Sequence, residues 1–384
     1  MCAVAAGPGA PPPVTRFPTP CLIVAVTGRA LAASALRGGP RAAVLDCFAD
    51  SDTRSLASAC RSVVSSRGIR FDENALLRAA RALAPPPAAL VYGSGFEGRT
   101  GLLARLARGR QLYGNAPEVV ERVRDPARFF PLLDRLGIAS PEVRLDRPGR
   151  ADGWLVKRPG GAGGAHVRHA AASPRPADAY YQRFEPGRTL SVLFLADGER
   201  ALILGANRQW TAAARLDRPF LYGGAVGGVS LPRAVDRDIH RRLDALVAAT
   251  GLVGLNGLDF ILQGNRWLAL ELNPRPTATM ELYDPDYPRG LFGWHLRACR
   301  GRLPAGPAAL RARRAHAVVF AAAPGRAAGL KFPGWCRDVP MPGVRFGRGD
   351  PVGTIHAVAR TGADALALLR RRHARIERML RTTA

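Results

Sequence analysis

The sequence predicts an α/β and α+β protein with an N-terminal doubly wound parallel sheet, a central antiparallel part and a small C-terminal β-rich module. Three observations predict this fold class. A strand–helix–strand pattern opens the chain at residues 21–47, and an antiparallel ribbon occupies residues 257–276. A Pro/Gly-rich segment at 332–354 precedes a last helical stretch. With 47% hydrophobic residues, the 384-residue chain can build more than one packed unit.

The first unit is expected to span residues 20–120, after a flexible tail at 1–19 that is rich in Pro, Gly and Ala and lacks the features of a secretion signal. Apolar runs separated by Gly and Pro predict a parallel sheet covered on both faces. The expected elements, in order, are a strand, a helix and a strand at 21–27, 29–37 and 42–47, helices at 53–66 and 74–83, and a strand at 88–92.

Polar side chains follow two of these strands. Asp46, Asp50 and Asp52 trail the second strand, and Ser94 and Glu97 follow the strand at 88–92. Open parallel sheets bind ligands at the carboxyl ends of their strands, so both groups are candidates for ligand contacts. Both are explained equally well as turn and capping residues, and the two interpretations stay open.

A lysine followed by a glycine-rich loop marks the next unit. A strand delivers Lys157, and the loop after it contains Gly160, Gly161, Gly163 and Gly164, whose backbone amides can wrap phosphate oxygens. Among the 56 Lys and Arg residues only Lys157 and Lys331 are lysines. Either these positions need a compact charge in a tight site, or the two lysines remain by chance. The lysine precedes the glycines, so the loop is no Walker motif, and a plain linker is the alternative.

The remaining elements are read from periodicity and breakers. Residues 116–137 are expected to be helical with an interruption at Pro126, and an amphipathic helix ends before Gly251. The other expected elements are a strand at 179–185, a hairpin at 189–206, the helix at 233–250, structured segments at 277–283 and 289–300, a strand at 315–322 and a last helix at 363–380.

The most informative stretch is residues 257–276, where two apolar, β-rich runs flank a Gly-Asn-Arg turn. If the turn is three residues long, Asp259 lies opposite Glu271, and Asn273 follows on the same face. A two-residue turn would shift the pairing by one and place leucines among the carboxylates. The side chains then expected to point into the core are Leu258, Phe260, Leu262, Leu268, Leu270 and Leu272.

Opposed carboxylates on neighbouring strands repel, so this face calls for a compensating cation. The oxygens of Asp259, Glu271 and Asn273 suit Mg²⁺, with Mn²⁺ as an alternative, and Mg²⁺ is usually shared with phosphate oxygens of a substrate. The competing interpretation is a solvated sheet face with no metal.

The net charge of +26 points to nucleic acid only as a minority interpretation, because the arginines are spread over the whole chain and their longest block is Arg370-Arg371-Arg372. No apolar run approaches the length that spans a membrane. The cysteines show no CxxC pairing and the histidines no HExxH motif. We therefore expect a cytoplasmic protein with reduced cysteines, no zinc and no membrane partner.

The ordered set of motifs resembles the ATP-grasp ligases. The matching features are Leu155-Val-Lys157 before the glycine-rich loop, Gln182-Arg-Phe-Glu185 with Pro186-Gly187, Leu258-Asp259-Phe260, and Glu271-Leu-Asn273-Pro-Arg275. The resemblance covers roughly residues 20–310. It implies a pre-ATP-grasp domain at 20–120, an ATP-grasp domain at 121–310 with a lid at about 150–208, and a C-terminal β module with a final helix at 311–384.

The same resemblance implies the cofactors and site residues. ATP would lie between the lid and the sheet, with Lys157 on its phosphates and the glycines at 160–164 closing over them. Adenine would be held by Gln182, Arg183, Phe184 and Glu185. Mg²⁺ would be bound by Asp259, Glu271 and Asn273, and Arg275 would steady the transferring phosphoryl group.

Two departures from the family pattern stand out. The acid that many members use to hold ribose is replaced by Arg188-Thr189, and the second phosphate lysine is absent, with Arg128 as its expected substitute. The segment from Glu271 to Tyr283 is most similar to a branch linked to tetrahydromethanopterin one-carbon metabolism, related to the tyramine–glutamate ligase of methanofuran-type cofactor synthesis.

The expected function is a carboxylate–amine ligase that forms an amide through an acyl phosphate, acting on small-molecule substrates. The alternatives are a nucleic-acid-binding protein on a degenerate nucleotide fold and a biotin-carboxylase-like enzyme, prompted by the C-terminal module. The sequence identifies neither the acid nor the amine, and homo-oligomerisation stays open.

Overall fold

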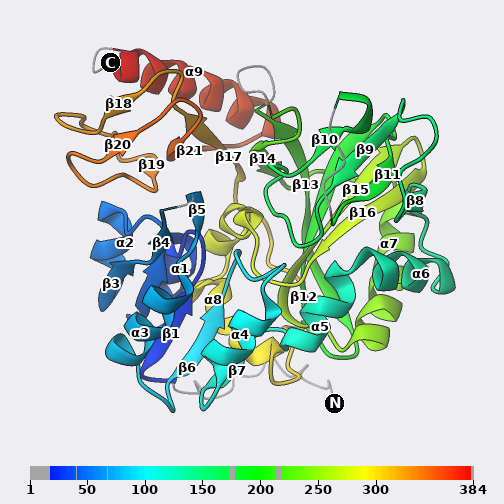
Figure 1. Ribbon diagram of the computed structural model, residues 1–384, viewed down its shortest axis with the longest axis horizontal. Helices are drawn as coiled ribbons and strands as arrows, with labels where there is room; N and C mark the ends of the chain where they lie inside the picture. The colour runs from blue at the N-terminus through cyan, green and yellow to red at the C-terminus, as the bar shows by residue number, and fades with distance from the viewer. Residues whose placement is uncertain (1–17, 40, 67, 173–177, 213–217, 382–384) are drawn as a thin grey trace, which may run out of the picture.

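The computed structural model describes residues 18–39, 41–66, 68–172, 178–212 and 218–381. Figure 1 shows the N-terminal parallel sheet in blue and cyan, the strands of residues 143–183 on the opposite side, and the C-terminal segment in orange and red above the N-terminal unit. The predicted tail lies almost wholly outside the described residues.

The N-terminal unit is a five-stranded parallel sheet with the order β3-β2-β1-β6-β7. Alternate strand residues face two separate cores, with Ile23 and Val44 on one side and Leu22 and Leu45 on the other, as a sheet covered on both faces requires. Its elements are β1 (Cys21–Val24), α1 (Arg29–Gly38), β2 (Ala43–Asp46), α2 (Ser51–Leu56), β3 (Ala59–Ser62), β4 (Val64–Ser65), β5 (Gly68–Phe71), α3 (Glu73–Leu83), β6 (Ala89–Tyr92), α4 (Thr100–Ala107) and β7 (Gln111–Tyr113).

The helix predicted over residues 53–66 is wrong beyond its first turn. Helix α2 ends at Leu56, and the chain then forms β3, which pairs with the free edge of β2 through Ala43↔Ala59 and Val44↔Cys60. Hydrogen bonds to an unpaired strand edge outweigh the modest local preference for helix in this segment.

A second, smaller sheet has four antiparallel strands in the order β10-β9-β11-β8. Two helices precede it, separated at Asp125 because Pro126 cannot continue the first one, as predicted. These elements are α5 (Pro117–Arg124), α6 (Pro126–Arg135), β8 (Val143–Arg144), β9 (Trp154–Lys157), β10 (Arg168–His169), η1 (Ala170–Ala172) and β11 (Tyr180–Arg183).

The largest sheet has eight strands in the order β16-β15-β12-β13-β14-β17-β21-β19 and is antiparallel throughout. Helix α7 has the predicted bounds and ends at Gly251, which adopts the left-handed conformation with φ of 70°. The elements are β12 (Arg188–Asp197), β13 (Ala201–Thr211), β14 (Tyr222–Gly227), α7 (Arg233–Thr250), β15 (Val253–Gln263), β16 (Arg266–Asn273), η3 (Ala278–Leu282), η4 (Asp284–Asp286), α8 (Gly290–Ala298), β17 (Arg313–Phe320), β18 (Gly325–Arg326), β19 (Cys336–Arg337), β20 (Arg345–Phe346) and β21 (Pro351–Ala359).

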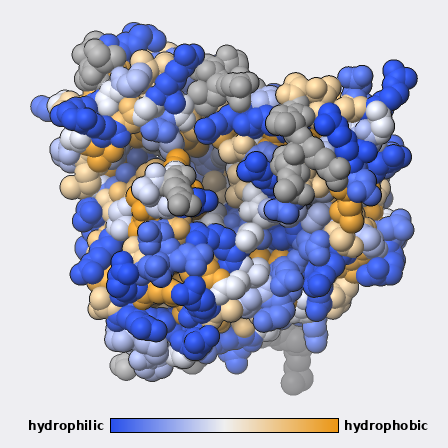
Figure 2. All heavy atoms as spheres, in the orientation of Figure 1, coloured by the Kyte–Doolittle hydropathy of each residue, from blue (hydrophilic) through white to orange (hydrophobic). Residues whose placement is uncertain are grey.

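The surface is mostly hydrophilic in the view of Figure 2, with a hollow at the centre of this face. Within the described ranges, no helix combines the length and the apolar character needed to cross a membrane.

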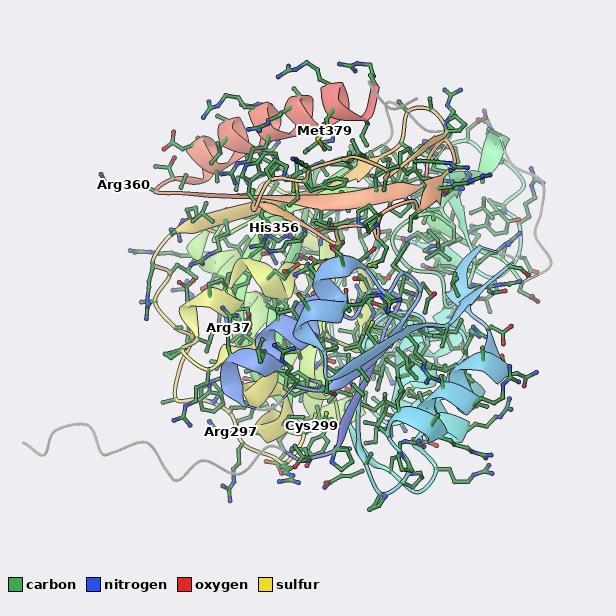
Figure 3. All side chains as sticks on the ribbon, turned by 90° about the vertical axis from the view of Figure 1, so that its left-hand side faces the viewer. Arg37, Arg297, Cys299, His356, Arg360 and Met379 are labelled. Carbon is green, nitrogen blue, oxygen red and sulfur yellow. The ribbon has the colours of Figure 1, made fainter. Side chains whose placement is uncertain are left out.

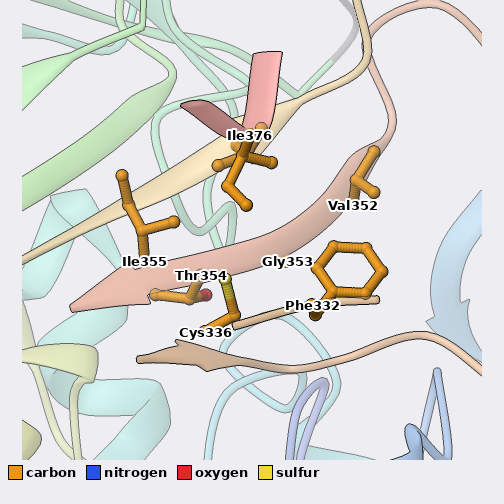
Figure 4. A pocket seen from close by; sticks show the side chains of 8 residues that line it. Phe332, Cys336, Val352, Gly353, Thr354, Ile355 and Ile376 are labelled. Atoms are coloured by element: carbon orange, nitrogen blue, oxygen red, sulfur yellow. The ribbon is translucent and has the colours of Figure 1, made fainter. Parts of the chain in front are cut away.

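The C-terminal β-rich module is present, and its strands β17, β21 and β19 continue the central sheet instead of forming a separate one. Helix α9 (Gly362–Arg381) covers one face of these strands. Figure 3 shows His356 on the opposite face, toward the N-terminal unit. Figure 4 shows an apolar pocket under α9, where Ile376 approaches Cys336 and Val352. The predicted domain boundaries at residues 120 and 310 stay a prediction.

The turn of the informative ribbon differs from the prediction. Gln263 pairs with Arg266, so the turn has two residues, yet Asp259 still faces Glu271 because a β-bulge lies between Phe260↔Ala269 and Asp259↔Glu271. Because of the bulge, the residues of β16 between the turn and the bulge that face the core are not the ones predicted. Trp267 and Ala269 join the core, whereas Leu268 faces Ile261 on the other side and Leu270, at the bulge, is half-buried.

Candidate functional site

Lys157 is the first side chain of the candidate site. It ends β9 and is 6% exposed, and its Nζ donates to Gln182 Oε1 on the paired strand β11 at 2.5 Å. Burial lowers the pKa of Lys157, while Glu271 and Asp259 act in the opposite direction. The compact ammonium is therefore held in a dry site that faces two carboxylates.

Arg124, the last residue of α5, connects three parts of the site. Its Nη1 forms an ion pair with Glu271 Oε1 at 2.7 Å and donates to Leu272 O, and its Nη2 donates to Gly161 O at 2.6 Å. Burial opposes ionisation of Glu271, but Arg124, Lys157 and His166 outweigh it and lower the pKa of Glu271 to about 2. Glu271 thus stays ionised at neutral pH.

Asp259 and Asn273 complete the row of oxygen donors on this face. Asp259 accepts one hydrogen bond from Gln209 Nε2 and one from Asn273 Nδ2, both at 2.9 Å. Burial and the neighbouring charge of Glu271 raise the pKa of Asp259 to about 6. Of the two carboxylates, Asp259 is therefore the one that its surroundings stabilise less in the ionised form.

The oxygen donors of Asp259, Glu271 and Asn273 are of the kind that Mg²⁺ prefers, so this set fits Mg²⁺. The set contains two carboxylates and one amide, which leaves coordination positions for water and phosphate oxygens. Glu271 also pairs with Arg124, so a cation here would share that carboxylate with the guanidinium.

The glycine-rich loop lies against both neighbouring units. A Cβ at Gly160 would lie 2.2 Å from Gly98 Cα, and a Cβ at Gly164 would lie 1.7 Å from Phe220 O. Gly163 O accepts a hydrogen bond from Tyr222 N at 2.9 Å. Only glycine permits these close approaches, so the loop is seated on the N-terminal unit and on the segment before β14.

Arg275 is held by Glu97 of the loop after β6. Its Nε donates to Glu97 Oε1 at 2.5 Å and its Nη2 to Asn273 Oδ1 at 3.2 Å. Burial opposes the charge of Glu97, but Arg275 and Arg124 lower its pKa below the ordinary value. Arg275 thus links the N-terminal unit to the row of oxygen donors.

The residues expected at adenine lie along β11 and just after it. Gln182 is fully buried, and its Nε2 has no hydrogen-bond partner within the described part of the chain. Such a buried donor is a natural contact for an acceptor on a ligand. The amides of Arg183 and Phe184 donate to Glu142 O and Gly153 O, and Glu185 Oε2 accepts from Gln263 Nε2 at 3.2 Å.

Sequence reasoning missed three members of this constellation, namely Arg124, Gln209 and His166. It favoured Arg128 as the substitute for the missing lysine, but Arg128 is 59% exposed and pairs with Glu121 and Asp125. The sequence offered one indication of Arg124, which is its place as the last residue before the helix break at Asp125-Pro126. His166 lies over Gly161, and burial lowers its pKa to about 4.

Comparison with known proteins identifies this architecture. Residues 124–279 match the family model described as the ATP-grasp domain. The carbamoyl phosphate synthase large chain of Deinococcus radiodurans is 26% identical over 200 residues, which cover 45% of this chain and 19% of that protein. The chain thus spans about a fifth of the length of the curated relatives it matches.

Solved structures extend the likeness to more than nine-tenths of the chain. The biotin carboxylase domain dimer of Hydrogenobacter thermophilus 2-oxoglutarate carboxylase, in complex with MgADP, ADP and bicarbonate, has a TM-score of 0.70 at 13% identity, covering 91% of this chain and 88% of that chain. The L-amino acid ligase from Bacillus licheniformis has a TM-score of 0.69 at 13% identity, covering 93% of this chain and 97% of that chain. These likenesses show the fold.

Proposed function

We propose that this chain, which has the ATP-grasp fold and matches the ATP-grasp domain family over residues 124–279, is an ATP- and Mg²⁺-dependent ligase that joins a carboxylate to an amine. The observation that carries the proposal is the convergence of Lys157, Asp259 and Glu271 beneath the glycine-rich loop. A cation and a row of oxygen donors in a buried site suit phosphoryl transfer, which depends on positioning and charge neutralisation.

The reaction has two steps. The substrate carboxylate attacks the γ-phosphorus of ATP, releasing ADP and forming an acyl phosphate; the amine then attacks the acyl carbon, and inorganic phosphate leaves as the amide forms. Lys157 and Arg275 hold the phosphate oxygens, and the loop with Gly160, Gly161, Gly163 and Gly164 excludes water. The β11 segment from Gln182 to Glu185 holds adenine.

Asp259, Glu271 and Asn273 would hold Mg²⁺, or Mn²⁺ in its place. The bound metal supplies positive charge that offsets the charge of the phosphate oxygens. The elevated pKa of Asp259, about 6, supports this assignment because an uncompensated carboxylate gains from a nearby cation.

A finer assignment concerns the substrates. The resemblance of the segment from Glu271 to Tyr283 to the one-carbon branch supports an acid and an amine used in methanofuran-type cofactor synthesis. A second candidate function is bicarbonate-dependent carboxylation, favoured by the likeness to biotin carboxylase structures over 91% of the chain. It predicts ATP cleavage that bicarbonate stimulates without any amine.

A screen for ADP release over amino acids and amines, with tyramine plus glutamate first and bicarbonate in parallel, separates these functions. Carboxylate–amine ligation predicts ADP release that needs both an acid and an amine and yields an amide by mass spectrometry. ATP binding without ADP release from any pair, or release driven by bicarbonate alone, contradicts it.

Glu271→Ala tests the site itself. We expect a fall in ATP turnover of at least about 100-fold, because the change removes a charge that would hold the metal against the phosphates. Glu121→Gln is the matched control, since Glu121 is an exposed acid that also pairs with an arginine. An active, Mg²⁺-dependent Glu271→Ala enzyme with normal circular dichroism would refute the assignment.

A further inference from the structure

A second polar cluster lies where the N-terminal unit, the η3 segment and the C-terminal module meet. At its centre Arg29, which is 2% exposed, donates from Nη1 and Nη2 to the two carboxylate oxygens of Glu281, both at 2.5 Å. Its Nε donates to Asp338 Oδ1 at 3.0 Å. The first turn of α1 is thereby tied to two segments that are distant in sequence.

Carboxylates outnumber cations in this cluster. Asp46 accepts hydrogen bonds from Gly28 N and Ala49 N, and Asp52 accepts them from Asp338 N and Val339 N. Asp50 is 7% exposed and makes no side-chain capping bond to α2. Burial and the charges of Asp338, Asp46 and Asp52 raise the pKa of Asp50 to about 8. Arg29 pairs with Glu281, Asp338 and Asp52, the charge of Asp338 acts on Asp46 and Asp50, and Arg37 is a second cation that acts on Glu281. Five carboxyl groups thus share two guanidinium groups.

Buried polar atoms without partners border the same cluster. In the described part of the chain, His316 Nδ1 and His356 Nε2 have no hydrogen bond, although His316 is only 1% exposed. The two rings lie side by side on paired strands, with centroids 5.7 Å apart, and His356 Nε2 is 3.8 Å from Glu281 Oε2. Figure 3 places His356 between β21 and the N-terminal helices. A buried ring nitrogen without a protein partner can form a hydrogen bond with a ligand or with water.

These neighbours determine which kind of ligand group the cluster can bind. Burial lowers the pKa of His316 to about 4, so this ring stays neutral and does not repel a cation. Over the described ranges, no set of three His, Cys, Asp or Glu side chains is arranged to hold a metal ion. A primary ammonium group carries positive charge and three N–H donors, which matches carboxylate and imidazole acceptors.

The cluster is accessible and close to the proposed nucleotide site. The exposed fractions of the side chains of Glu281, Asp338 and His356 lie between 16% and 19%, so a small ligand can reach them. Tyr222 connects the two sites, because its hydroxyl contacts His316 Nε2 at 2.7 Å and its pKa is raised by burial and by both Asp259 and Glu281.

We propose that Asp50, Glu281, Asp338, His316 and His356 form the binding site for the amine substrate, which they recognise as a primary ammonium group. This inference rests on the proposed ligase function and names its second substrate site. The ammonium nitrogen donates to the carboxylates on binding and must lose one proton before it attacks the acyl phosphate. That proton passes to solvent, which reaches the partly exposed carboxylates of Glu281 and Asp338.

Binding of small amines to the full-length protein tests the proposal. The probes are 1,4-diaminobutane and phenethylamine, each compared with the alcohol of the same skeleton, in thermal-shift and calorimetric titrations. We expect saturable binding of the amines, no binding of the alcohols, and at least a tenfold loss of amine affinity in Asp50→Asn. Asp72→Asn, which alters the N-cap of α3 in the same unit, should bind like the wild type.

The outcomes separate this inference from the proposed function. Equal binding of amines and alcohols by the wild type overturns the ammonium site and needs no variant. Wild-type ADP release with an acid and an amine, together with unchanged amine affinity in Asp50→Asn, overturns the site but leaves the ligase function standing. Selective amine binding that Asp50→Asn weakens, without ADP release for any acid, supports the site and contradicts the ligase function.

Discussion

At the scale of single residues, two neighbouring arginines lie in opposite environments. Arg128 has the expected spacing but points into solvent, whereas Arg124 is 7% exposed at its side chain and contacts Glu271, Leu272 and Gly161. A planar guanidinium can reach a carboxylate and two carbonyls at once, which a lysine ammonium at the same position cannot do.

Arg124→Lys should therefore raise the KM for ATP about 10- to 100-fold, because charge-assisted hydrogen bonds of about 1.5–3 kcal/mol are lost. Arg128→Lys is the control and should leave KM unchanged, since its ion pairs are exposed. Steady-state kinetics with varied ATP checks both variants. Equal effects of the two changes would place Arg124 outside the nucleotide site.

At the scale of elements, the glycine-rich loop works by its fit to two neighbours. Gly163 and Gly164 both have positive φ, at 64° and 71°, so any side chain strains both positions. They differ in space, since a Cβ at Gly163 meets nothing within 4 Å and a Cβ at Gly164 lies 1.7 Å from Phe220 O. Alanine substitutions at these two positions therefore distinguish the effect of backbone strain from the effect of a steric clash with Phe220.

Gly164→Ala should lower kcat/KM for ATP at least about 100-fold and make the loop more sensitive to limited proteolysis, because the added Cβ prevents the loop from packing against Phe220. Gly163→Ala carries only the strain of the left-handed conformation, about 1–2 kcal/mol, and should keep most of the activity. Indistinguishable kinetics and proteolysis of the two variants would show that seating on Phe220 is unimportant.

At the scale of the whole molecule, a buried histidine joins the parallel sheet to the large antiparallel sheet. His295 in α8 accepts a hydrogen bond from Leu255 N at Nδ1, at 2.9 Å, and its Nε2 contacts Tyr113 O at 3.1 Å. Only the neutral ring can accept at Nδ1. Burial lowers the pKa of His295 from 6.5 to about 4.

Stability should depend on pH through this junction. Between pH 6.5 and about 4 the unfolded chain binds a proton that folded His295 excludes, so the contribution of the neutral ring is complete above pH 6.5 and falls as the pH drops toward 4. His295→Gln should lose stability at pH 7.5 but depend less on pH, so its gap to the wild type narrows on acidification. Urea unfolding at pH 7.5, 5.5 and 4.5 measures this gap.

The control for this experiment is His240→Gln, on the surface of α7, whose side chain is 48% exposed. It should follow the wild type at every pH. A gap between wild type and His295→Gln that stays constant with pH would mean that the His295 ring does not titrate against folding.

The sequence by itself determined the local patterns, namely the βαβ opening, the helix α7, the lysine before the glycines and the pairing of Asp259 with Glu271. These follow from periodicity and turn chemistry, which act over a few residues. The predicted turn length was wrong, but the predicted pairing of Asp259 with Glu271 was right. A β-bulge restored this pairing, and Trp267 and Ala269 pack into the core between the bulge and the turn.

Only the tertiary structure decided what depends on contacts between distant segments. It placed Arg124 rather than Arg128 against Glu271, turned residues 59–62 into the edge strand β3, and gathered Asp50, Glu281 and His356 around Arg29. These outcomes depend on burial and on unpaired strand edges, which arise when separate elements pack together and which no local sequence pattern encodes.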